Sequence, residues 1–145
     1  PVADAILREI EAAGYRILST RVVRLSSTDI WRLYGFDING VKVTSRQNAA
    51  VMFRAYYQTL RTGLCLLLFV HHASPRVFTI SCELKGLAYH PCACSPDSIR
   101  YRYRDPRWDA VMIPPGAFII PPTDNVIHCP SSPHDFLPIY EKFWR

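Results

Sequence analysis

Hydrophobic residues near the N-terminus recur with the spacing of an amphipathic helix. Ile6, Leu7 and Ile10 fall on one face, and charged residues fall on the opposite face. This pattern predicts a helix over residues 3–13, and we expect a strand to follow it over residues 16–25.

Two further helices are predicted from start and stop signals. The run Ser26-Ser27-Thr28-Asp29 consists of residue types that cap helix N-termini, and it predicts a helix over residues 28–34. Apolar residues at helical spacing then predict a helix over residues 47–61, which Gly63 ends.

The second half of the chain begins with patterns typical of strands. Apolar runs predict strands over residues 64–71 and 76–83, and a loop is expected over residues 84–99. Arg and Tyr then alternate over residues 100–104, as in a half-buried strand with Tyr inward and Arg outward.

A proline-rich insertion, a loop that contains His128 and a helix over residues 134–143 complete the chain. The mixture of elements predicts an α+β fold with an antiparallel sheet. Because the sequence has no internal repeat and no low-complexity linker, we expect residues 1–145 to form a single domain.

Composition indicates a packed globular protein. The chain has 145 residues, of which 49% are hydrophobic and 20% are charged, enough for one core. The apolar run over residues 64–70 is too short to cross a bilayer, so no membrane contact is expected. The odd number of cysteines, 5, favours an intracellular, reducing compartment over a disulfide framework.

His128 is the first candidate for chemistry. It ends a short apolar run directly before a turn, and a neutral imidazole is a competent nucleophile near pH 7. Asn125, three residues upstream, can steady the loop through bonds from its side chain to the backbone. The alternative is that His128 simply caps a strand.

The Arg/Tyr segment allows three interpretations. The net charge of +5 and the interleaving of Arg102 and Arg104 with tyrosines suit contact with RNA phosphates and bases. The same pattern is typical of an exposed strand, and also of a surface that binds an acidic protein partner. No metal site is expected, since Cys92 and Cys94 lack the usual two-residue gap between zinc ligands and no second pair follows.

Several segments match one protein family in the same chain order. They are the helix that ends in Gly14-Tyr15, the segment 29–34 ending in Tyr34, Thr62-Gly63 before an apolar strand, His90-Pro91, the segment 96–100 ending in Arg100, and Asn125-Val126-Ile127-His128. Together they resemble the nucleoside diphosphate kinase family, in which Asn-x-x-His carries the histidine that accepts phosphate.

The resemblance implies a ferredoxin-like βαββαβ sandwich and a phosphotransfer site. His128 would accept the γ-phosphate of a nucleoside triphosphate as phosphohistidine and pass it to a diphosphate, with Mg2+ on the phosphates. The implied helpers fall into three groups: Tyr34 and Asn125 to orient the imidazole, Arg100, Lys85 and Tyr89 to contact phosphates, and Met52, or Phe53 or Tyr56 in a shifted register, beside the nucleobase.

The chain departs from the family in three places. Cys129-Pro130-Ser131 replaces the Gly-Ser-Asp that follows the family's histidine, and Pro130 restricts the loop. The family's first strand and its Lys-Pro-Asp motif are missing, and the segment between Arg100 and Asn125 is longer than in the family. Since a central strand cannot simply be omitted, we expect these residues to be part of a longer polypeptide, or another chain to supply the strand.

These departures favour a diverged nucleoside-diphosphate-kinase-like domain that acts mainly as a structural or binding module among other protein subunits, with weak nucleotide binding. Family analogy adds a cytoplasmic or ciliary, axonemal setting. One alternative is an active kinase that works through phospho-His128, and a second is an RNA-contacting subunit.

Overall fold

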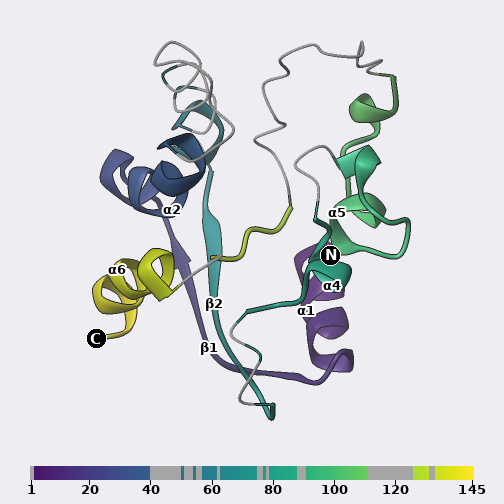
Figure 1. The fold of residues 1–145 in the computed structure, drawn as a ribbon, viewed down its shortest axis with the longest axis horizontal. Coiled ribbons are helices and arrows are strands. Elements are labelled where there is room, and N and C mark those ends of the chain that lie inside the picture. The colour runs from purple at the N-terminus through teal and green to yellow at the C-terminus, as the bar shows by residue number, and fades with distance from the viewer. Residues whose placement is uncertain are drawn as a thin grey trace. The chain divides into compact units, whose positions relative to one another are not determined.

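The computed structural model describes ten parts of the chain. They are residues 2–39, 50, 54, 57–61, 63–74, 77, 79–87, 91–110, 126–130 and 133–145. Within them Figure 1 shows α1 (Val2–Ala12), β1 (Tyr15–Val23), α2 (Ser27–Asn39), β2 (Cys65–His72), α4 (Cys82–Lys85), η1 (Pro91–Ala93), α5 (Ile99–Arg102), η2 (Pro106–Ala110) and α6 (Pro133–Trp144).

The fold is a mixed α+β arrangement with one two-stranded antiparallel sheet, in which β1 pairs with β2. The predictions of α1, β1, α2, β2 and α6 are confirmed, with ends that shift by a few residues. Of the helix predicted over residues 47–61, the described positions are helical and the rest lies outside the described residues. No helix in the described ranges is both long enough and apolar enough to span a bilayer.

Contacts divide the chain into two compact units. Unit 1 consists of Pro1–Leu18 and Phe69–Cys129, and unit 2 consists of Ser19–Leu68 and Pro130–Arg145. Each unit is therefore built from segments that are far apart in the sequence.

In unit 1, α1 is fixed to the segment around α5. Ile6 and Ile10 are buried, as the helical spacing predicted. Beside this buried face, Glu9 accepts a hydrogen bond of 2.5 Å from the Tyr103 hydroxyl and forms an ion pair with Arg102. One carboxylate therefore binds two side chains more than 90 residues away.

The strand predicted over residues 76–83 is wrong, because Cys82–Lys85 form the helix α4. The Tyr15 hydroxyl donates to the Thr79 carbonyl at 3.4 Å and accepts from the Ser81 N–H at 3.0 Å. The Ser81 side chain then accepts from the Leu84 N–H at 3.2 Å and caps the helix. A tyrosine side chain thus satisfies backbone groups that a neighbouring strand would otherwise bind.

The strand predicted over residues 100–104 is also wrong. Ile99–Arg102 form the helix α5, and the Tyr103 N–H donates to the Ile99 carbonyl at 3.1 Å. Ile99 and Arg100 are adjacent and both buried, which an alternating strand with one solvent face does not allow. The adjacent residues Arg102 and Tyr103 both contact Glu9 of α1.

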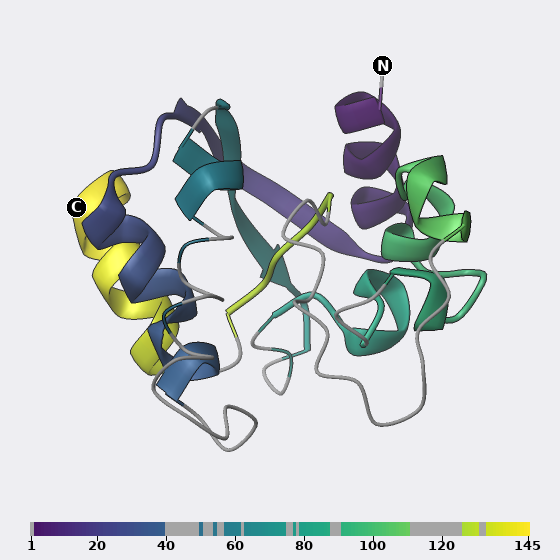
Figure 2. The same ribbon diagram turned by 90° about the horizontal axis from the view of Figure 1, so that it is seen from above.

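The core of unit 2 lies beneath α2 and α6, which pack against each other (Figures 1 and 2). Its centre is formed by Leu25 and Ile30. The partly buried residues that pack against this pair are Val23, Leu33, Tyr57, Leu60, Cys65 and Phe143.

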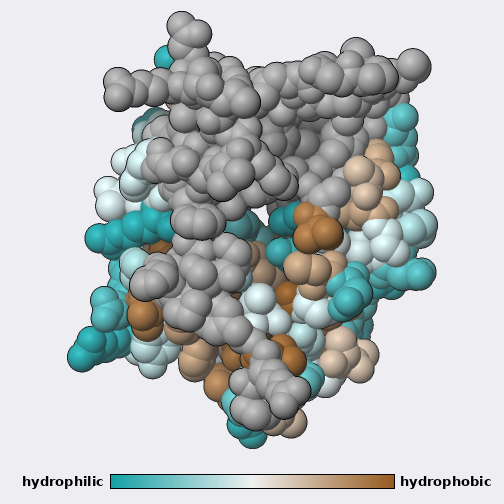
Figure 3. Space-filling model, viewed as in Figure 1, coloured by the Kyte–Doolittle hydropathy of each residue, from teal (hydrophilic) through white to brown (hydrophobic). Residues whose placement is uncertain are grey.

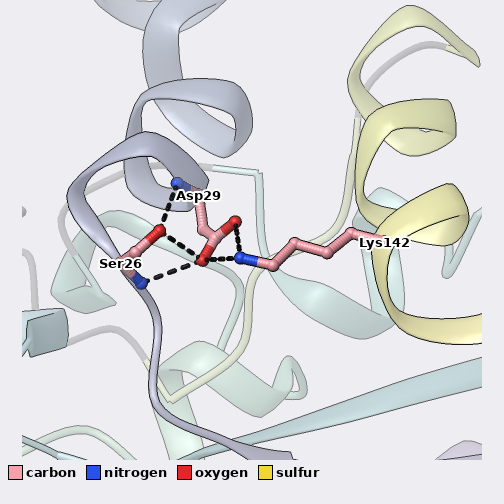
Figure 4. Close-up of polar contacts among 3 residues, drawn as sticks. All are labelled: Ser26, Asp29 and Lys142. Carbon is pink, nitrogen blue, oxygen red and sulfur yellow. Dashed lines mark hydrogen bonds and ion pairs between the residues drawn. The ribbon is translucent and has the colours of Figure 1, made fainter.

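A capping box opens α2 and is tied to α6 (Figure 4). The Ser26 side chain accepts from the Asp29 N–H at 3.3 Å, while Asp29 accepts from the Ser26 N–H at 2.9 Å. Asp29 is 0% exposed, and Lys142 of α6 donates to both of its carboxylate oxygens at 2.7 Å. Burial acts to raise the pKa of Asp29, but the bonds from Lys142 and Ser26 outweigh it and hold the pKa below 3.8.

We predict that Asp29→Asn lowers the free energy of unfolding by about 2 kcal/mol, because it removes the ion pair and weakens the cap. The measurement is urea unfolding followed by circular dichroism at pH 7. Since the folded pKa lies below the ordinary value of 3.8, this contribution is present above that pH and is lost as the pH falls through the folded pKa.

The matched control is the exposed pair between Arg145 and Glu141 on α6. Arg145→Gln should change stability by less than about 0.5 kcal/mol. Equal effects of the two substitutions would contradict a special role for Asp29.

Candidate functional site

Arg100 is the best-connected of the candidate site residues in the described part of the chain. It is 5% exposed, and its Nη1 donates to the Gly86 carbonyl at 3.2 Å. Its Nε and Nη2 both donate to the Ile127 carbonyl, at 3.3 Å and 3.2 Å. The guanidinium therefore bridges two main-chain segments and places Arg100 beside the segment that contains His128.

The turn before α5 positions this arginine. The Ser98 side chain is buried and donates to the Ser95 carbonyl at 2.7 Å, and the Arg102 N–H donates to the Ser98 carbonyl at 3.0 Å. Ile99 is 0% exposed and anchors the same turn in the interior of unit 1. A packed helix start thus directs the arginine side chain inward.

Gly86 supplies one of the two carbonyls because no side chain fits there. Its φ is 101°, a conformation that favours glycine. An added Cβ would lie 2.9 Å from the Cys94 sulfur and 3.0 Å from both the Arg100 Cβ and the Ser98 hydroxyl. The backbone at Gly86 can approach Arg100 closely for this reason.

His128 lies in a segment that is neither helix nor strand, directly after the Ile127 carbonyl that Arg100 binds. Its side chain is half-buried, and its Nε2 atom is buried. The next residue, Cys129, is also buried, and burial raises the pKa of its thiol although Lys85, Thr79 and Arg100 act in the opposite direction. The Cys129 thiol is therefore protonated at neutral pH and is a poor nucleophile.

Three of the predicted site residues meet in this region of unit 1. Arg100 binds the residue before His128, and Lys85 acts on the thiol of the residue after it. The others lie outside the described residues, or their side chains do: Tyr34, Met52, Phe53, Tyr56, Tyr89 and Asn125.

The residues that the sequence did not single out are Gly86 and Ile127, which contribute main-chain carbonyls. A glycine directly after Lys85 was the one available signal, because glycine permits a positive φ. Ile127 carried no signal, since any residue could offer the same carbonyl.

The Arg/Tyr segment is occupied by contacts within unit 1. Arg102 is paired with Glu9. The Arg104 Nε lies 2.6 Å from the Asp109 carboxylate, and its guanidinium stacks over the Tyr101 ring at 3.9 Å. An RNA phosphate would have to displace these carboxylates.

The cysteines of this region do not assemble a metal site in the described residues, where no group of three His, Cys, Asp or Glu side chains gathers. The Cys92 thiol instead lies 3.5 Å from the Asp109 carboxylate. Burial and the neighbouring carboxylate raise the pKa of Cys92.

Comparison with protein-family models, with curated proteins and with solved structures found no match.

We predict that Gly86→Ala lowers the free energy of unfolding by more than about 1 kcal/mol, because the residue has a positive φ and its neighbours crowd the new methyl group. Chemical denaturation measures the loss. Gly63→Ala is the matched control: nothing lies within 4 Å of its added Cβ, so stability should be unchanged or slightly higher. A loss at Gly63 equal to that at Gly86 would refute the packing argument.

Proposed function

We propose that this chain is a diverged nucleoside-diphosphate-kinase-like domain that serves mainly as a structural or binding module in a larger assembly. The observation that carries the proposal is the use of Arg100. A phosphate-binding arginine must present its N–H groups to the ligand, whereas three of these groups here donate to the Gly86 and Ile127 carbonyls. The Arg100 guanidinium therefore stabilises the fold around the site.

The remaining groups offer limited support for phosphotransfer. The buried Nε2 of His128 is poorly placed to meet a phosphate, and Cys129 and Pro130 occupy the positions of the family's Gly and Ser. Mg2+ would come with a nucleotide, and the described surroundings of Arg100 do not fit that complex because the guanidinium is turned to main-chain carbonyls. Among the described candidate residues, Lys85 is the remaining cation for weak nucleotide contact.

The expected cost to catalysis is large. Phosphoryl transfer depends on positioned charge, and loss of one well-placed donor typically removes about 2 to 4 kcal/mol of transition-state stabilisation, or a factor on the order of 10² to 10³ in rate. Because Arg100 is bound to main-chain carbonyls, a loss of this size is expected here.

The ferredoxin-like topology belongs to the same proposal. The two-stranded sheet of the described residues is compatible with part of a βαββαβ core. A place among other protein subunits belongs to the same proposal, and the cytoplasmic or axonemal setting follows by family analogy alone.

One arrangement favours the alternative of an active kinase, in which His128 forms phosphohistidine. Arg100 lies beside the His128 segment, and Lys85 lies close enough to influence the next residue. This is the combination of imidazole and cations that the reaction uses.

Incubation with γ-32P-labelled ATP and Mg2+ tests the choice. We expect no acid-labile label above the level of His128→Ala, because Arg100 donates to main-chain carbonyls and not to a γ-phosphate. His71→Ala, which removes an exposed histidine, is the control for labelling elsewhere. Stoichiometric acid-labile label that disappears only in His128→Ala would establish the kinase and overturn the proposal.

Arg100→Lys separates a structural from a phosphate-binding arginine. Lysine keeps the charge but cannot bridge two carbonyls with a rigid fork, so we expect a loss of about 2 kcal/mol in unfolding free energy. Arg107→Lys, at an exposed arginine, should stay within about 0.5 kcal/mol. Unchanged stability together with weaker ADP binding in Arg100→Lys would favour the phosphate role.

A further inference from the structure

The net positive charge of the chain is concentrated in unit 2. Residues 19–68 and 130–145 contain nine Lys and Arg against four Asp and Glu, whereas unit 1 contains eight of each. The whole formal net charge of +5 therefore belongs to unit 2. Hydrophilic residues, in teal, lie over α2 and α6 of this unit in Figure 3. A surface for a polyanion is expected on unit 2, and not on the neutral unit that contains the Arg/Tyr segment.

Within unit 2 the excess charge lies in residues 19–68. Asp29 is paired with Lys142, and Glu141 is paired with Arg145, so these two acids neutralise cations of the C-terminal segment. Residues 19–68 contain seven Lys and Arg, against a single acidic residue besides Asp29. The first segment of unit 2 is therefore the basic one.

Two of its arginines meet at the helical residues 57–61. Arg24 follows β1 directly and donates to the Arg61 carbonyl at 3.2 Å. The Arg61 guanidinium lies over the Tyr57 ring at 5.3 Å. Both arginines are exposed, while Tyr57 is partly buried and packs against the core of unit 2. Contacts within the unit thus hold Arg24 and Arg61 at one place on its surface.

Arg54 extends this positive surface along the helix. Positions 54 and 57–61 are helical, and seven residues make about two turns, or about 10 Å. Arg54 and Arg61 therefore lie on nearly the same side, and both are exposed. Leu60 points elsewhere, since it packs against the core. We call Arg24, Arg54 and Arg61 the arginine cluster.

We propose that the arginine cluster binds the phosphate backbone of a single-stranded nucleic acid, with a base placed against Arg61. The inference rests on the proposed function as a binding module and names its surface and its partner. Guanidinium groups bind phosphate oxygens through two N–H groups at once. Proteins that bind single strands combine such positive surfaces with flat side chains on which bases stack.

The chemistry of the cluster favours this partner over other polyanions. All three cations are arginine, whose planar group fits phosphate and also stacks on rings. Arg61 already lies over Tyr57, which leaves the outer side of an exposed guanidinium for a base. An acidic peptide or an anionic membrane has no flat ring to place there. In a duplex the bases are stacked on each other, so a single strand fits better.

A fluorescein-labelled oligonucleotide of about 12 uridines provides the probe, within the length that one binding domain covers. We expect the full chain to bind it at low salt. Three phosphate contacts give a slope of about −2 for the logarithm of affinity against the logarithm of salt concentration. The affinity should therefore fall about 20-fold between about 50 and 200 mM salt. Anisotropy titration measures both quantities.

Removal of one cluster charge should weaken binding and flatten the salt dependence. Arg54→Gln, at an exposed position, is expected to lower the affinity at about 50 mM salt about five- to tenfold and to reduce the slope by about 0.7. The matched control is Arg145→Gln, which removes an exposed arginine of unit 2 that is paired with Glu141 and should leave the slope unchanged. Arg102→Gln tests the Arg/Tyr segment and should have the smaller effect.

Arg61→Lys separates stacking from charge. Lysine keeps the positive charge but has no planar group to lie between Tyr57 and a base. We expect the salt slope to stay the same while the affinity falls about threefold or more. An unchanged affinity in Arg61→Lys would reject the base contact and overturn the proposal.

Four further results would overturn the proposal. They are no binding at low salt, an affinity independent of salt, equal losses in Arg54→Gln and Arg145→Gln, or a greater loss in Arg102→Gln than in Arg54→Gln. Competition distinguishes other partners: displacement of the oligonucleotide by poly-glutamate or by anionic phospholipid vesicles at equal charge concentration would identify an acidic protein or a lipid surface instead.

Failure of this inference is distinguishable from failure of the proposed function. Labelling of His128 together with oligonucleotide binding that Arg54→Gln weakens would reject the structural module but keep the arginine cluster as a binding surface. Absence of label with no oligonucleotide binding would keep the module and reject the arginine cluster.

Discussion

The guanidinium of Arg100 is the contact on which the organisation of unit 1 depends. It joins the Gly86 carbonyl, 14 residues before it, to the Ile127 carbonyl, 27 residues after it. A charge that is 5% exposed is tolerated only when its donors are satisfied, and here the acceptors are main-chain oxygens. The position of the His128 segment, the close approach at Gly86 and the proposed loss of phosphate binding all follow from this arrangement.

The elements that could be predicted from the sequence are those whose local hydrophobic or capping pattern agrees with their contacts in the fold. α1 shows helical spacing and buries Ile6 and Ile10, and α2 begins at the capping residues that the sequence displays. The two wrong strands were decided by distant partners. Tyr15 binds the backbone near Ser81 from 66 positions away, and Glu9 binds the segment after Ile99 from more than 90. No local window contains those residues.

The candidate site was predictable in its members but not in their roles. His128 was a candidate from its place directly before a turn, whereas Arg100 and Lys85 were candidates only through the resemblance to the nucleoside diphosphate kinase family. Every residue has a main-chain carbonyl. The presence of isoleucine at position 127 therefore could not show that Arg100 binds the backbone and not a ligand. The ion pair between Asp29 and Lys142 was also not predictable from the sequence, since 113 residues separate its partners.

That ion pair also bears on how the chain is made. Unit 2 is discontinuous, because Pro130–Arg145 joins Ser19–Leu68 only after the whole of Phe69–Cys129 has been added. During synthesis on the ribosome, the Asp29 carboxylate of α2 has no Lys142 partner until α6 emerges. This interval is on the order of ten seconds at typical elongation rates. During that interval the apolar surface that α6 will cover stays open to chaperones.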